Sequence, residues 1–293
     1  MAGIAARFGS AHQFPLRNTN ALATASGRLC LRSSGVDFNT LGATMSFHPV
    51  LDLARYALYC APEPTSAWWR AGCSWLGRNA ANGDVCPQPV IPGVSSAHQR
   101  QMTATAARYG FHATLKAPFR LSAGATEADL VTLAAAFAAG EASLPLPALA
   151  VRPLGNFLAL QLPTNSNAIG PVSDLAMRCV ERFDLLRTPP SAAELARRSG
   201  SVLTARQDAL LARWGYPYTE EEFRLHFTLT DDMPTLAPEA RQAVRQAAET
   251  AFVAPLARHQ QINGLTIFRE LAPGQPFMVW RRFGFGKTSA APR

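Results

Sequence analysis

The sequence predicts a mixed α and β protein in which the second half repeats the plan of the first. Each half holds a strand of alternating polarity with a His-x-Thr motif, then a helix, then two more strands. The next strand after the motif is expected at residue 148, which lies 36 residues after His112, and at residue 262, which lies 36 residues after His226. We therefore expect two lobes built on one plan.

The composition indicates a folded protein with a large core. Of the 293 residues, 48% are hydrophobic and 16% are charged, and no apolar run is long enough for a membrane span. The net charge of +8 is scattered along the chain, which argues against duplex nucleic acid as a partner. Five cysteines without a Cys-x-x-Cys motif predict neither a disulfide framework nor a zinc ribbon, so we expect a soluble protein of the cytoplasm.

Residues 1–44 differ from the rest of the chain. They carry four arginines against one acidic residue and show neither a helical nor a strand period. We expect a disordered or non-native extension with Met45 as the true start, although a transit peptide or a tethered tail also fits this composition. Residues 45–293 are then expected to form one domain, with lobes at about 45–165 and 166–293 and a helical insertion at about 188–215.

The elements of the first half begin with the run Arg-Tyr-Ala-Leu-Tyr-Cys at 55–60, which predicts a strand. Tryptophan-rich residues 65–76 favour a short helix, and a loop follows because residues 80–95 are rich in proline and glycine. The rest of this half is expected to hold a helix at 96–108, a strand at 109–118, a helix at 127–139 capped by Thr126, and strands at 148–154 and 156–162.

In the second half, a helix is expected at 172–184 and a helical stretch at 191–214. The capping-box pattern Ser191-x-x-Glu194 opens this stretch, and Gly215 ends it because glycine adopts the left-handed conformation easily. The remaining elements are expected to be a strand at 223–230, a helix at 238–252, and strands at 262–269 and 277–283.

The two histidine strands have a polar and an apolar face each. In the first, His112, Thr114 and Lys116 share the polar face. In the second, the polar face holds Arg224, His226, Thr228 and Thr230. A polar strip on a strand whose other face is apolar has to meet water, a ligand or another polar surface.

If the two strips lie together, they combine two imidazoles, two hydroxyls and two cations. One histidine can then accept a proton while the other donates one, because an imidazole titrates near neutral pH. The hydroxyls of Thr114 and Thr228, with Lys116 and Arg224, can bind phosphate oxygens. This set favours acid–base chemistry at a phosphodiester, although either motif alone is more often a histidine packed near a sheet.

Other kinds of site lack their motifs in this sequence. There is no His-Glu-x-x-His or other metal-ligand spacing, no Gly-x-Ser-x-Gly elbow, no P-loop and no Gly-x-Gly-x-x-Gly. We therefore expect neither a metal site nor a cofactor.

Longer segments resemble a known family. The paired histidine strands resemble the two-histidine (2H) phosphoesterase superfamily, and within it the branch of phosphonate-metabolism proteins of unknown function. The similar segments are 55–59, 109–119 and 203–230, the last with Trp-Gly-Tyr-Pro-Tyr at 214–218, and the resemblance extends over about 53–286.

The resemblance implies an α+β fold of two pseudo-symmetric lobes, each an antiparallel sheet with helices on its outer side, around a central cleft. It implies that His112 and His226 are the catalytic acid and base, in either order, and that Thr114 and Thr228 bind phosphate. The implied function is that of a metal-independent hydrolase, which opens a cyclic phosphodiester of a small phosphosugar in phosphonate metabolism.

Two alternatives stay open. The first is an RNA-end enzyme, a 2′,3′-cyclic phosphodiesterase or 2′,5′-RNA-ligase-like protein, for which Tyr216 and Tyr218 are candidate stacking residues. The second is a non-catalytic sensor that binds a phosphorylated ligand. The sequence leaves the oligomeric state open.

Overall fold

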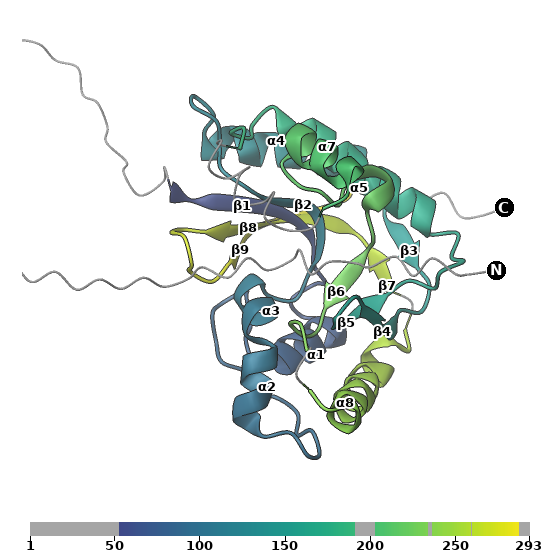
Figure 1. Ribbon diagram of the computed structural model, residues 1–293. Coiled ribbons are helices and arrows are strands. Elements are labelled where there is room, and N and C mark those ends of the chain that lie inside the picture. The colour runs from purple at the N-terminus through teal and green to yellow at the C-terminus, as the bar shows by residue number, and fades with distance from the viewer. Residues whose placement is uncertain (1–52, 191–202, 234–235, 259, 287–293) are drawn as a thin grey trace, which may run out of the picture.

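The computed structural model describes residues 53–190, 203–233, 236–258 and 260–286. Over these residues the protein is α+β, with helices packed around antiparallel sheets, as the sequence predicts (Figure 1). No helix in the described ranges is long and apolar enough to cross a membrane. The predictions about residues 1–44, Met45 and the Ser191–Glu194 capping box fall outside the described residues.

The main sheet has four strands in the order β2-β1-β8-β9. Their bounds are Ala113–Phe119 for β2, Arg55–Cys60 for β1, Gly264–Glu270 for β8 and Met278–Gly284 for β9. The central strands β1 and β8 are buried on both faces, which suits their continuous runs of apolar and aromatic residues. The strand β2 lies at one edge, and His112 directly precedes it.

A second sheet has three strands in the order β4-β5-β6, with bounds Ala150–Leu154, Phe157–Gln161 and His226–Thr228. The strand β6 is shorter than the predicted 223–230. Beyond it, the amides of Leu229 and Thr230 both donate to the carbonyl of Leu158, so the regular ladder ends there. A small third sheet, not predicted, pairs β3 (Leu144–Leu146) with β7 (Gln260–Ile262).

The two large sheets exchange strands between the halves of the chain. The first histidine strand, β2, lies in the sheet that holds the C-terminal strands β8 and β9. The second histidine strand, β6, pairs instead with β5 of the first half. Each sheet therefore combines a histidine strand from one half with a strand pair from the other, a connection that the repeat in the sequence does not reveal.

Helices lie on both sides of the strands (Figure 1). On one side are α4 (Glu127–Gly140), α5 (Ile169–Asp184) and α7 (Ala205–Trp214). On the other side are α1 (Ala67–Leu76), α2 (Ser96–Met102), α3 (Ala104–Tyr109) and α8 (Pro238–Leu256). A single turn of 3₁₀ helix, η2, covers Glu220–Glu222.

The helix ends follow the expected local chemistry, with one exception. Thr126 caps α4 in a capping box with Asp129, and Gly215 ends α7 with a left-handed φ of 73°. The helix predicted at 96–108 is divided into α2 and α3. The carboxylate of Asp231 accepts hydrogen bonds from the amides of Thr105 and Ala106, which creates a second helix start inside the predicted range.

An aromatic cluster lies beneath the two histidine strands. The ring centroids of Phe111 and Phe227 are 5.3 Å apart, and the Trp68 ring lies 4.7 Å from Phe227. All three side chains are buried. Since side chains alternate along a strand, packing these aromatic residues in the core turns His112 and His226 to the opposite, polar side.

Candidate active site

The two His-x-Thr motifs lie at strand edges that contact each other. The edge strand β2 of the main sheet contacts β6, the edge strand of the second sheet. His112 precedes β2 and His226 begins β6, so the motifs come together from two different sheets (Figure 1). The expectation that the two polar strips meet agrees with this arrangement.

His112 is held from three directions. Its Nδ1 lies 2.8 Å from the carbonyl oxygen of Gly110, and its Nε2 lies 3.3 Å from the Thr114 hydroxyl. The Tyr59 ring stacks on the imidazole with centroids 3.6 Å apart and an angle of 15° between the planes. Tyr59 reaches this place because it pairs with Thr114 across the β1–β2 ladder.

His226 repeats the local geometry of His112 in different surroundings. Its Nδ1 lies 2.8 Å from the carbonyl oxygen of Arg224, again two residues earlier in the chain. The Phe157 ring lies beside it, tilted and 5.9 Å away between centroids. The imidazole of His226 also lines a cavity.

These backbone contacts assign the tautomer of both histidines. A carbonyl oxygen only accepts hydrogen bonds, so each Nδ1 that contacts one carries the proton and donates it. In the neutral imidazole the lone pair is then on Nε2. Both motifs therefore present a basic Nε2, set by the same contact to residue i−2.

Burial favours the neutral form of both imidazoles. Burial lowers the pKa of His112 to about 3, against a smaller raising effect of the Gly110 carbonyl and a further lowering by the charge of His226. Burial also lowers the pKa of His226, opposed by the Arg224 carbonyl. The effect of His226 on the pKa of His112 indicates that the two rings are close enough to interact electrostatically.

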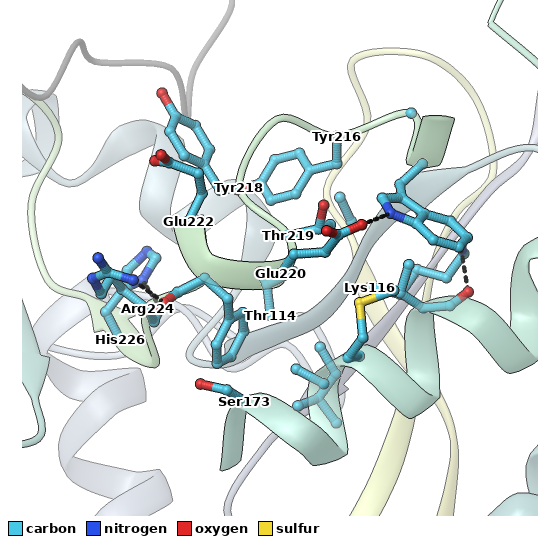
Figure 2. Close-up of a pocket in the computed structure, with 18 of the residues that line it drawn as sticks. Thr114, Lys116, Ser173, Tyr216, Tyr218, Thr219, Glu220, Glu222, Arg224 and His226 are labelled. Atoms are coloured by element: carbon cyan, nitrogen blue, oxygen red, sulfur yellow. Dashed lines mark hydrogen bonds between the residues drawn. The ribbon is translucent and has the colours of Figure 1, made fainter. Parts of the chain in front are cut away.

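A cavity extends from His226 along β2, α5 and the segment that follows α7 (Figure 2). In the figure, His226 and Arg224 lie at one end, Thr114 in the middle and Lys116 toward the other end. Much of the wall is apolar and comes from α5 and from the aromatic residues of the covering segment. Polar groups are therefore few, and their places decide what the cavity can bind.

The predicted phosphate-binding residues differ in their positions. Thr114 lines the cavity and contacts His112, whereas His112 and Thr228 are half-buried and are both absent from the cavity wall. Arg224 lines the cavity at the histidine end and is exposed. Its Nη1 donates to the carbonyl oxygens of Glu221 and Phe223 at 2.6 and 2.7 Å, so its own loop orients it.

Lys116 lies in the wall but points toward α5. Its ammonium group donates to the carbonyl of Val180 and to Oδ1 of Asp184, both at 3.1 Å, and it is 3% exposed. Burial lowers the pKa of Lys116, and the Asp184 carboxylate opposes this effect. The residue therefore holds the end of α5 against β2, and the sequence pattern that placed it beside Thr114 did not indicate this partner.

Several residues of the cavity were not found from the sequence. Arg187 and Thr219 contribute polar atoms to the wall, and Trp214 and Glu220 form a hydrogen bond of 2.7 Å above it. No motif marks Arg187 or Thr219, because they come from loops after α5 and α7. Among the described residues, no group of three or more His, Cys, Asp or Glu side chains lies together as a metal site would require.

Two curated relatives resemble most of this chain. The protein named ribose 1,5-bisphosphate phosphokinase PhnN from Janthinobacterium sp. (strain Marseille) is 48% identical over 234 residues, which are 80% of this chain and 51% of the relative. A protein of the same name from Laribacter hongkongensis (strain HLHK9) is 39% identical over 232 residues, 78% of this chain and 51% of the relative. The chain spans about half the length of these relatives.

These names correct one expectation. A phosphokinase transfers a phosphoryl group, and it is not a phosphoric diester hydrolase. The predictions of a hydrolase and of a cyclic phosphodiesterase were therefore wrong. The paired histidines, which suggested that reaction, fit any chemistry that moves protons at a phosphoryl group.

A family model matches more than half of this chain. A family model described as "Protein of unknown function (DUF1045)" matches residues 114–278, a range that includes Thr114, His226 and most of the cavity wall. The chain belongs to this family, DUF1045.

Proposed function

We propose that this chain binds a phosphorylated pentose of phosphonate metabolism, with one phosphate group between the two His-x-Thr motifs. The relatives named after ribose 1,5-bisphosphate support the class of ligand. The polar groups at the histidine end of the cavity support the place, since hydroxyl, imidazole and guanidinium groups are the usual partners of phosphate oxygens.

The observation that carries this proposal is the matched geometry of the two histidines. Each Nδ1 donates to the carbonyl two residues earlier, which leaves the lone pair of each ring on Nε2. Two neutral, desolvated imidazoles near the contact of β2 with β6 are a costly arrangement for a structural core, because each ring gives up hydration. A bound phosphate would reverse this cost by stabilising protonated imidazole.

We propose further that the imidazoles move protons at the phosphoryl group. A neutral Nε2 can accept a proton from a hydroxyl of the sugar or of the phosphate, and the resulting imidazolium can donate it to a phosphoryl oxygen. Thr114, in contact with Nε2 of His112, orients that ring toward the ligand. Arg224, oriented by its own loop, supplies a positive charge at the mouth.

Isothermal titration calorimetry with ribose 5-phosphate and ribose 1,5-bisphosphate tests this proposal. We expect both ligands to bind the wild type, and His112→Asn and His226→Asn each to weaken binding by at least about tenfold, since each removes a charge-assisted hydrogen bond. Proton uptake on binding, measured in buffers of different ionisation enthalpy, is expected for the wild type and not for the double variant.

The matched control is His98→Asn, a change of the same kind at an exposed histidine of α2 that does not line the cavity. It should leave both affinities unchanged. The proposal fails if the wild type binds neither ligand, or if both active-site variants bind as tightly as His98→Asn. Binding without proton uptake would leave a phosphosugar receptor and remove the part of the proposal that concerns proton transfer.

A further inference from the structure

The end of the cavity away from His226 contains more positive than negative charge. Lys116 and Arg187 both contact one carboxylate, Asp184, at 3.1 Å and 2.7 Å respectively. Burial raises the pKa of Asp184, but Arg187 and Lys116 outweigh this effect and keep the carboxylate ionised. Two cations thus share a single anion in a wall that is otherwise largely apolar.

The nearby acidic residues do not remove this surplus. Glu220 contacts Arg206 and Arg213, and Arg206 also contacts Glu221, so these two cations offset these two anions. The remaining carboxylate of the wall, Glu222, lies with Arg224 at the histidine end (Figure 2). One positive charge is therefore left over beside Arg187.

Two polar atoms of the same region have no protein partner within the part of the chain that the structure describes. These are Nη1 of Arg187 and the hydroxyl oxygen of Thr219, both buried. Nε and Nη2 of Arg187 are held by Asp184, and Nη2 also donates to the carbonyl of Arg213 at 3.0 Å. The guanidinium is therefore fixed, with Nη1 left to donate to something else.

The hydroxyl of Thr219 makes no hydrogen bond to the described residues. It precedes η2 as the capping residue but makes no side-chain capping hydrogen bond, and its side chain is 5% exposed. A buried hydroxyl without a partner costs free energy, and a buried surplus charge costs more. Both costs disappear if an anion binds between Thr219 and Arg187.

We propose that Arg187 and Thr219 form a second anion subsite, which binds the second phosphate of a pentose bisphosphate. This inference rests on the proposed function, which places the first phosphate at the histidines. Thr114 and Lys116 share one face of β2 two residues apart, about 7 Å along the strand, so a ligand bound beside Thr114 reaches the second subsite by extending along this face. A pentose with phosphates at both ends has this extended form, and apolar residues of α5 would lie against its sugar ring.

The decisive variant is Thr219→Val. Valine has nearly the shape of threonine and lacks the hydroxyl, and no hydrogen bond of the folded protein is lost with it. We expect the wild type to bind ribose 1,5-bisphosphate at least about tenfold more tightly than ribose 5-phosphate, since the second phosphate makes charge-assisted hydrogen bonds. In Thr219→Val this preference should fall about tenfold, from the loss of one hydrogen bond to a charged group.

Three further measurements complete the test. The melting temperature of ligand-free Thr219→Val should equal or exceed that of the wild type, and Thr132→Val, at an exposed position of α4, should leave the preference unchanged. Arg187→Gln should abolish the preference, and if it fails to fold, Thr219→Val still decides.

The possible failures are distinguishable. If the wild type binds both sugars equally, or if Thr219→Val keeps the full preference, the second subsite is disproved while the first remains. If His112→Asn and His226→Asn have no effect, or neither sugar binds, the proposed function fails and the second subsite fails with it.

Discussion

The surroundings of His112 and His226 differ although their motifs and their Nδ1 contacts are the same. His112 belongs to a four-stranded sheet, with Tyr59 stacked against one side of its ring. His226 begins a three-residue edge strand, and the Phe157 ring beside it is tilted and 5.9 Å away. The motif sets the tautomer of each histidine. The surrounding fold sets the pKa of each ring.

The two imidazoles are also coupled electrostatically. Burial lowers the pKa of both rings, and a charge on His226 lowers the pKa of His112 further. Uptake of a proton by one ring therefore opposes uptake by the other.

The largest expected effect is on the free energy of unfolding, through an ion-pair cluster at the end of the main sheet. Glu270, fully buried at the end of β8, contacts Arg55 and Arg108 and accepts a hydrogen bond from the amide of Gly274. Glu270→Ala should lower the free energy of unfolding by about 3–5 kcal/mol, because it leaves two cations without their shared partner. Urea denaturation measures this change.

The control for that measurement is Glu249→Ala, which removes an exposed partner of Arg245 on α8. Its effect should stay within about 0.5 kcal/mol. If both variants unfold at the same urea concentration, the main sheet does not depend on its buried ion pairs, and the contrast between the two histidine regions loses its structural basis.

A smaller effect is expected for the ring that shields His112. Tyr59→Leu should cost about 2 kcal/mol of stability through lost packing. It should also raise the pKa of His112 toward its ordinary value, since water then reaches the imidazole. Phe157→Leu, the matched change beside His226, should move the pKa of that ring less. Histidine resonances followed by NMR during a pH titration report both values, and equal shifts in the two variants would contradict the comparison.

A further expected effect is a slope of stability with pH. The pKa of His112 is about 3 in the folded protein, against an ordinary value of 6.5. Between these values the unfolded chain holds a proton that the folded protein lacks, so stability falls with falling pH by about 1.4 kcal/mol per unit. Above about pH 7 the contribution is constant, because the ring is then neutral in both states.

Carboxylates add their own acid dependence, so the measurement compares the wild type with His112→Asn. The difference between their free energies of unfolding at about pH 7 and about pH 5 isolates the histidine. The wild type should lose more stability over this interval. An identical loss in both proteins would mean that the ring of His112 titrates in its ordinary range.

The sequence predicted most elements, because these depend on local signals. Alternation placed Phe111 and Phe227 inside and the histidines on the other side, and single residues such as Thr126 and Gly215 marked helix ends. The division of the helix at 96–108 was missed, since it depends on Asp231, more than a hundred residues away.

The cavity could be predicted only at its histidine end. Thr114, Arg224 and His226 follow from the two motifs, whereas Arg187 and Thr219 act through partners that no short pattern contains. Lys116 shows the opposite error: its place on the polar face was predicted, but Asp184 on α5 takes up its charge. Ion pairs between distant elements carry no local sequence signal, so they appear only when the chain is folded.

The exchange of strands between the halves has a consequence for how the protein is made. Pairing β5 with β6 joins Ala159 to Thr228, and pairing β1 with β8 joins Arg55 to Glu270. Contacts of such long sequence separation form late and slowly in folding. During synthesis the first histidine strand leaves the ribosome long before β8 completes its sheet, so neither half of the chain can assemble a site alone. Two separately expressed halves would have to fold around each other, as a complemented pair, before either could bind a ligand.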